Sequence, residues 1–184
     1  MAYLAAAVIV VGIIGLLNLV LALGVIRRLR EHTVRLTALE AGHGHGHSDG
    51  IMLGAGSAVQ PFQAVTEDGV TVTRDGLAGP TLVAFFSPDC TPCRERMPQF
   101  IRYAAEHPGG RDRVVGVVVS DRAAAGEYVA ALSPVARVVV ESDGGPLCTA
   151  FGVQGFPAIS LIDESGVVVA SGSLIEDLSA PVAG

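Results

Sequence analysis

Two cysteines stand two residues apart in the stretch FFSPDCTPC, which covers residues 85–93. The apolar run TLVAFF (81–86) before them has the length of a buried strand, and residues 90–107 carry apolar positions on one helical face. A helix that begins at Cys90 directs its free N–H groups and its positive dipole end at that sulfur, which stabilises a thiolate. Cys93 lies one turn further, within reach to resolve a mixed disulfide. The spacing favours a redox pair.

Other roles for the cysteines fit the sequence less well. A zinc site needs four ligands, and neither Cys148 nor His107 lies in a motif with ligand spacing. A structural staple between Cys90 and Cys93 would close a loop too short to remove much unfolded-state entropy. We interpret Cys148, in PLCTAF, as a small buried apolar residue rather than a third redox thiol, and His107 as a residue at a helix C-terminus.

The apolar excess of the chain is concentrated at its start, where residues 3–26 contain no charged side chain. These 24 residues, as a helix, span the ~30 Å hydrocarbon core of a bilayer. Arg27, Arg28 and Arg30 follow directly, which is typical of a retained anchor rather than a cleaved signal peptide. We therefore predict that residues 1–26 form a single transmembrane anchor in a lipid bilayer.

The anchor is followed by a predicted helical stub and a Gly/His-rich linker, together residues 27–55. His43, His45 and His47 alternate with glycine, so a flexible chain can wrap imidazoles around a metal ion. Nothing in the sequence pre-orients these rings. We interpret the stretch primarily as a flexible tether and count the three histidines only as a minor metal candidate.

Residues 56–184 are predicted to form the globular domain. Strands alternate with helices and the pattern closes with a hairpin, which indicates an α/β sandwich with a mixed sheet. The second long helix is expected to open at Ser120 or Asp121. The predicted strands cover 62–65, 69–73, 81–86, 113–120, 136–140, 157–163 and 166–171, and the predicted helices cover 90–107, 121–132, 145–151 and 174–178.

The order strand–CxPC–helix, followed by GVQGFPAISLID (152–163), resembles the thioredoxin superfamily. More closely, the chain is similar to membrane-anchored TlpA/ResA-like and MauD-like thiol-disulfide oxidoreductases, over about residues 57–180. The resemblance implies a thioredoxin-like three-layer sandwich, in which helices flank a mixed β-sheet, in addition to the N-terminal transmembrane helix. It also implies a βα insertion between the second helix and Pro157.

The resemblance assigns roles to six residues. They are Cys90 as nucleophile, Cys93 as resolving thiol, Thr91 and Pro92 as the rest of the motif, and Phe156 with Pro157 as the cis-proline loop that hydrogen-bonds an extended substrate strand. No cofactor is implied beyond the redox-active Cys90–Cys93 disulfide.

The chain departs from the family pattern around the pair. Asp89 stands where many relatives have Trp, and its charge should disfavour a Cys90 thiolate. Ala84 occupies the place of thioredoxin's buried acid. Many ResA-like proteins have an acid at the position of Arg96, which here follows Glu95. Glu95 and Asp89 are therefore the candidates for the group that accepts the proton of Cys93.

The resemblance implies an enzyme that reduces disulfides in exported or maturing proteins and is regenerated by a membrane electron donor. Two alternatives remain open: a disulfide-introducing oxidase that uses the same pair, and a protein that handles copper or another soft metal. Residues 51–184 carry eight arginines and fifteen acidic residues, a balance that excludes a nucleic-acid partner.

Two arguments about orientation conflict. The arginines after the anchor favour a cytoplasmic domain by the positive-inside rule. The family resemblance favours the extracytoplasmic face, where disulfides form and need editing. We follow the resemblance and expect a single-pass protein of the cytoplasmic membrane with its domain on the extracytoplasmic face.

Overall fold

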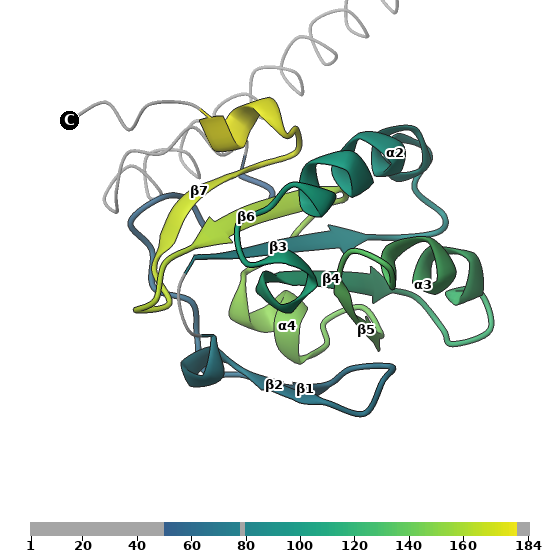
Figure 1. The fold of residues 1–184 in the computed structure, drawn as a ribbon, viewed down its shortest axis with the longest axis horizontal. Helices are drawn as coiled ribbons and strands as arrows, with labels where there is room; N and C mark the ends of the chain where they lie inside the picture. Colours follow the sequence, from purple (N-terminus) through teal and green to yellow (C-terminus); the bar gives the residue numbers. More distant parts are fainter. Residues whose placement is uncertain (1–49, 78–79, 180–184) are drawn as a thin grey trace, which may run out of the picture. The chain divides into compact units, whose positions relative to one another are not determined.

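A computed structural model of the chain describes residues 50–77 and 80–179 (Figure 1). The predicted anchor (1–26), the helical stub, the linker up to residue 49 and the histidines His43, His45 and His47 lie outside the described residues. Among the residues that are described, no helix is both long and apolar enough to cross a membrane. The transmembrane anchor stays a prediction.

The centre of the fold is a five-stranded sheet in the order β5–β4–β3–β6–β7. β3, β4 and β5 run parallel, whereas β6 is antiparallel to both β3 and β7, so the predicted mixed sheet is confirmed. All residues of β3 and β4 are buried, which explains their continuous apolar runs. The strands are β3 (Thr81–Phe86), β4 (Val114–Val119), β5 (Arg137–Glu141), β6 (Ala158–Ile162) and β7 (Val168–Gly172).

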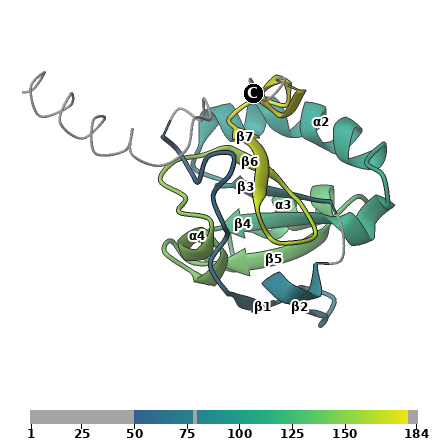
Figure 2. The ribbon, with the colours of Figure 1, turned by 90° about the vertical axis from the view of Figure 1, so that its left-hand side faces the viewer.

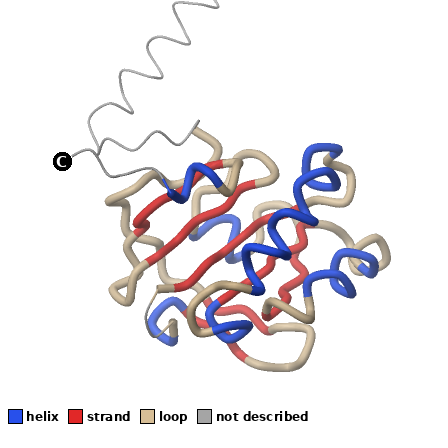
Figure 3. The backbone as a smooth tube through the Cα atoms, turned by 45° about the horizontal axis from the view of Figure 1, so that its top comes forward, coloured by secondary structure: helices blue, strands red, loops and turns tan. Residues whose placement is uncertain are grey.

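Side chains that alternate along β3 divide the interior into two core layers. Leu82 and Phe86 belong to one layer with residues of α2 (Thr91–Ala105) and α3 (Gly126–Leu132). Val83 and Phe85 belong to the other layer with residues of α4 (Pro146–Ala150). Figure 3 shows α2 crossing the sheet on the face toward the viewer. The predicted three-layer sandwich is confirmed.

A separate hairpin, β1 (Gln63–Val65) with β2 (Thr71–Thr73), lies next to β5, as Figure 2 shows. The amide of Glu67 donates to the carbonyl of Val138 at 2.8 Å, which joins the hairpin to the edge of the sheet. At its turn, hydrogen bonds from Thr66 and then Arg111 lower the pKa of Asp68 to about 2. The Asp68 carboxylate is therefore ionised near neutral pH, where it accepts the hydrogen bonds that stabilise the turn.

The predicted βα insertion consists of β5 and α4. Glu141, at the end of β5, is buried, and its carboxylate accepts hydrogen bonds from the amides of Leu147 and Cys148 at 3.1 and 2.7 Å. These are free N–H groups of the first turn of α4, so the carboxylate satisfies donors that the helix cannot. Gly145 leaves room for it, since a Cβ there would lie 2.6 Å from Cδ of Glu141.

The N-terminal part of the described chain is packed on the domain. Met52 and Val59 are buried in the core layer that contains α4. Between them, Gly56 donates to the carbonyl of Val168 at 2.8 Å, and Ala58 forms an isolated bridge with Val167 at the edge of β7. Met52 thus packs in the core although it lies within the predicted linker, residues 27–55.

Two helical predictions differ from the structure. α3 begins at Gly126 rather than at Ser120 or Asp121, because the carboxylate of Asp121 accepts a hydrogen bond from the amide of Ala124 and closes a turn instead. The final helical piece is the single 3₁₀ turn η3 (Glu176–Ser179). The other predicted elements are present with boundaries shifted by a few residues.

Candidate active site

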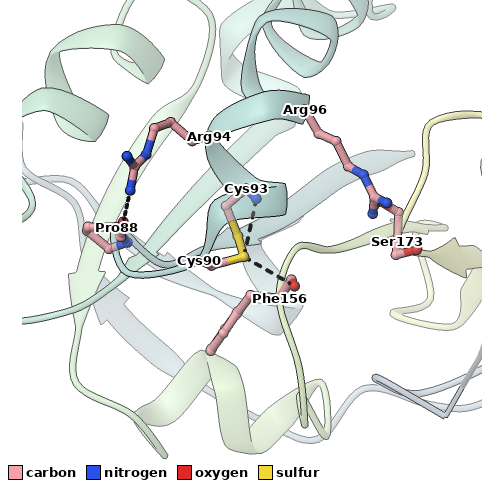
Figure 4. Close-up of a disulfide and its surroundings, with 7 residues drawn as sticks. All are labelled: Pro88, Cys90, Cys93, Arg94, Arg96, Phe156 and Ser173. Atoms are coloured by element: carbon pink, nitrogen blue, oxygen red, sulfur yellow. Dashed lines mark hydrogen bonds between the residues drawn. A yellow bond between two sulfur atoms is a disulfide. The ribbon is translucent and has the colours of Figure 1, made fainter.

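Cys90 and Cys93 form a disulfide at the start of α2, with their Cα atoms 5.3 Å apart (Figure 4). β3 ends at Phe86, and the chain turns into the helix through a hydrogen bond from the amide of Cys90 to the carbonyl of Ser87. Cys90 is the N-cap residue, and Pro92 suits the first turn because its missing N–H is not needed there. The structure thus places the pair at the helix N-terminus, as the sequence predicts.

The two sulfurs have different environments. Cys90 is partly exposed, whereas Cys93 is fully buried in the layer between the sheet and α2. The amide of Cys93 donates to Sγ of Cys90 at 3.2 Å, so a free N–H group of the helix points at the outer sulfur. This arrangement stabilises a thiolate at Cys90 after reduction, while Cys93 is shielded from partners in solution.

The loop before β6 lies opposite the pair. The Phe156–Pro157 peptide bond is cis, and Pro157 is buried. The carbonyl oxygen of Phe156 lies 3.3 Å from Sγ of Cys90, where it can accept the hydrogen bond of the reduced thiol (Figure 4). The structure therefore brings together Cys90, Cys93, Phe156 and Pro157, which the sequence separates by more than sixty residues.

Two arginines on the first turns of α2 reach away from the pair on opposite sides (Figure 4). Arg94 donates to the carbonyl of Pro88 at 3.3 Å and so braces the turn before Cys90. Arg96 donates to the carbonyl of Ser173 at 3.1 Å and so ties α2 to the end of β7. Sequence reasoning treated Arg96 only as a departure from a family pattern and did not anticipate this link.

The predicted proton acceptors Glu95 and Asp89 are both exposed. Neither forms a hydrogen bond or ion pair with another described side chain, and neither contacts Cys93 in that way. Ala84, in the place of thioredoxin's acid, is fully buried in the same layer as Cys93. Among the described residues, the one buried carboxylate is Glu141 at the end of β5, which accepts hydrogen bonds from the first turn of α4 and not from the pair. The proton acceptor stays a prediction.

The family follows from a comparison with known protein families, in which residues 54–180 match the family described as Redoxin. The chain belongs to the Redoxin family. With this match, the α/β sandwich and the Cys90–Cys93 disulfide identify it as a thioredoxin-like oxidoreductase. A search of the curated proteins found no match.

Solved structures show that this Redoxin family member has the thioredoxin-like fold. The thioredoxin domain of a thiol-disulfide oxidoreductase from Bacteroides vulgatus is 22% identical, with a TM-score of 0.52 over 68% of this chain and 93% of that one. A thiol-disulfide oxidoreductase from Bacteroides fragilis is 18% identical, with a TM-score of 0.55 over 67% and 95%. A thiol:disulfide interchange protein from Bacteroides sp. is 23% identical, with a TM-score of 0.51 over 65% and 81%.

One further polar group of this Redoxin protein lies beyond Arg96. Gln99 of α2 donates to the carboxylate of Glu176 at 2.8 Å. The pKa of Glu176 is lowered, first by its own backbone N–H and then by Gln99, and Arg96 adds a smaller contribution. This carboxylate is hydrogen-bonded to α2 and, among the described residues, to no cysteine. Among the described residues, no group of three or more His, Cys, Asp or Glu side chains can hold a metal ion.

The third cysteine, Cys148, is a free thiol buried in the core layer that contains α4. Burial raises its pKa strongly, and the neighbouring carboxylates of Glu141 and Asp143 raise it further. A thiol that resists ionisation is a poor nucleophile. The structure therefore favours the interpretation of Cys148 as a buried apolar residue over that of a third redox thiol.

We predict that Cys148 does not react in the folded protein. After reduction, iodoacetamide at pH 8 should label Cys90 within minutes and leave Cys148 unlabelled for at least about tenfold longer, as mass spectrometry of peptides can measure. The same treatment in urea should label all three cysteines. Rapid labelling of Cys148 without denaturant would contradict its burial.

Proposed function

We propose that this protein is a membrane-tethered thiol-disulfide oxidoreductase that reduces disulfides in exported or maturing proteins. The Redoxin family supports the exchange chemistry, and the similar structures carry names of the same activity. The observation that carries the proposal is the unequal exposure of the pair, with Cys90 partly exposed and Cys93 buried. An outer nucleophile beside an inner resolving thiol is what stepwise exchange requires.

The reaction proceeds in two exchanges. The Cys90 thiolate attacks one sulfur of a substrate disulfide, a mixed disulfide forms, and the other substrate sulfur leaves as a thiolate. Cys93 then loses its proton and attacks Sγ of Cys90, which forms the Cys90–Cys93 disulfide and releases the second substrate thiolate. Two electrons pass to the substrate, and a dithiol donor at the membrane returns two electrons to the pair.

The residues around the pair have separate tasks in this proposal. The N-terminus of α2 stabilises the attacking thiolate of Cys90. The backbone around Phe156 and cis-Pro157 receives an extended substrate strand beside Cys90. Glu95 or Asp89, both exposed close to the pair in sequence, takes the proton of Cys93 through solvent.

A disulfide-introducing oxidase is the second candidate, and one observation favours it. The described chain has no buried carboxylate in the layer of Cys93. Without a buried acid beside it, the thiolate of the reduced form is not destabilised by a neighbouring negative charge, which favours a higher reduction potential.

The reduction potential of the Cys90–Cys93 couple separates the two candidates. We expect a value near that of thioredoxin, about −270 mV, after equilibration of the full chain in glutathione buffers and quantification of both forms by acid quench and alkylation. A value near about −120 mV would reject the reductase and support the oxidase. A Cys148→Ala variant serves as control, because its potential should equal that of the unchanged protein.

The location on the extracytoplasmic face is also part of the proposal. It rests on the 24 uncharged residues 3–26 and on the need for disulfide editing outside the cytoplasm. Protease added to intact spheroplasts should remove the domain, whereas a cytoplasmic marker protein should survive. Survival of the domain until the membrane is permeabilised would place it in the cytoplasm, as Arg27, Arg28 and Arg30 favour.

A further inference from the structure

The segment Ile51–Leu53 lies along the chain that leads from α4 to the cis-proline. The amide of Leu53 donates to the carbonyl of Phe151 at 2.9 Å, and the amide of Gln154 donates to the carbonyl of Ile51 at 2.7 Å. On its other side the segment is fixed to the sheet, since the hydroxyl of Ser171 on β7 donates to the carbonyl of Leu53 at 2.8 Å. We call residues 51–53 the N-terminal strap.

The side chains of the N-terminal strap cover two glycines of this connection. Cγ2 of Ile51 lies 3.5 Å from the position that a Cβ would take on Gly155. Leu53 covers Gly152 in the same way, with Cδ2 at 3.5 Å from the corresponding position. Ile51 and Leu53 are both partly buried against the core, so each fills the space beside the connection at a different glycine.

The contact of Ile51 lies directly beside the site. Gly155 precedes Phe156, whose carbonyl oxygen lies 3.3 Å from Sγ of Cys90. Within residues 154–156 of the described chain, the amide of Gln154 is the one main-chain group held by a main-chain hydrogen bond from another segment, and the acceptor is Ile51. Ile51 therefore limits where Phe156 and the cis-proline can lie relative to the pair.

We propose that Ile51 is a positioning residue for thiol-disulfide exchange, which holds the loop of Phe156 and Pro157 at the distance from Cys90 that a substrate strand needs. This inference rests on the proposed function of the pair. Exchange requires three sulfurs in line, and a bound substrate strand is fixed to this loop, so a small shift of the loop misaligns the attack. A small disulfide that does not pair with the loop is insensitive to such a shift.

Single-turnover kinetics of the reduced full chain in detergent test the inference with two probes. One probe is a pair of extended eight-residue peptides joined by one disulfide, and the other is the small aromatic disulfide 5,5′-dithiobis(2-nitrobenzoic acid). For Ile51→Ala, which removes Cγ2, we expect the second-order rate constant with the peptide probe to fall about tenfold, while that with the small disulfide changes less than about twofold.

Three further variants control for packing and stability. Ile51→Val retains Cγ2 and should react with both probes like the unchanged protein. Ile51→Leu keeps the side-chain volume but moves the branch away from Gly155, so it should show the loss even if Ile51→Ala folds poorly. Leu53→Ala removes a matched aliphatic side chain of the same strap that contacts Gly152 instead, and it should retain at least half of the rate.

Each outcome has one meaning. Equal rates for Ile51→Ala, Ile51→Leu and the unchanged protein, or equal losses with both probes, would overturn the positioning role. A loss in Leu53→Ala as large as in Ile51→Ala would overturn it as well, since the effect would then belong to the strap as a whole. If the unchanged protein does not react with the peptide disulfide, the proposed function fails, which is a different result.

Discussion

Replacement of Cys93 by serine is expected to convert transient exchange complexes into stable mixed disulfides. Cys90 keeps its exposed position at the N-terminus of α2 and still attacks, but the buried sulfur that would release the substrate is gone. In Cys93→Ser cells, non-reducing gels should reveal disulfide-linked complexes at least about tenfold above the unchanged protein, and dithiothreitol should dissolve them. Mass spectrometry of the linked peptides should find Cys90 in every complex.

Two matched variants complete this experiment. The double variant Cys90→Ser/Cys93→Ser should form no complexes, because the nucleophile is absent. The double variant Cys93→Ser/Cys148→Ser should form as many as Cys93→Ser alone, because Cys148 is buried and its pKa is raised. If the complexes disappear when Cys148 is also replaced, Cys148 and not Cys90 is the sulfur that attacks the substrate. If Cys93→Ser forms no complexes at all, the exchange mechanism is rejected.

Phe151→Ala is expected to cause a large loss of stability. The ring of Phe151 is fully buried, with its centroid 5.4 Å from that of Phe85 in β3 and 5.9 Å from that of Phe62 before β1. Removal of a buried aromatic ring costs about 3–5 kcal/mol through lost burial and the cavity left behind. Chemical denaturation of the unchanged protein and the variant should measure this difference in the free energy of unfolding.

Phe151 makes contacts through its ring and through its main chain, and a second variant tests the ring alone. Its carbonyl accepts the hydrogen bond of Leu53, so the same residue joins the core to the N-terminal strap. Phe151→Leu keeps an apolar side chain of intermediate volume and should lose roughly half as much stability as Phe151→Ala. A cost below about 1 kcal/mol for Phe151→Ala would mean that the surrounding side chains close the cavity, contrary to the tight packing of this layer.

The part of the fold that sequence predicts is the part with strong local signals. β3 and β4 are apolar at nearly every position, and Cys90 is followed by a proline suited to a first helical turn, so their types and order could be read directly. The start of α3 was predicted too early because Asp121, a residue typical of helix caps, closes a turn with Ala124 instead. Local residue preference did not distinguish these two uses of one carboxylate.

In the candidate site, too, some residues could be predicted from local sequence and others could not. Cys90 and Cys93 follow from spacing, whereas the position of Phe156 and Pro157 opposite them came only from a family resemblance, since 66 residues separate Phe156 from Cys90. The contacts of Arg96 with Ser173 and of Ile51 with Gln154 had no sequence signal at all. They depend on which loop ends meet once the sheet has formed, and no periodicity reports that.

Because the cysteine pair precedes the loop of Phe156 in the chain, the two halves of the site are synthesised at different times. A ribosome that adds 5–20 residues per second needs roughly 3–13 s to proceed from Cys90 to Phe156, and longer still to reach Ser171, which fixes Leu53. During that interval both thiols are synthesised but the loop that will flank them is not. The newborn chain therefore passes through a period in which its cysteines can be oxidised by any nearby disulfide, before the loop that is to align partners with Cys90 exists.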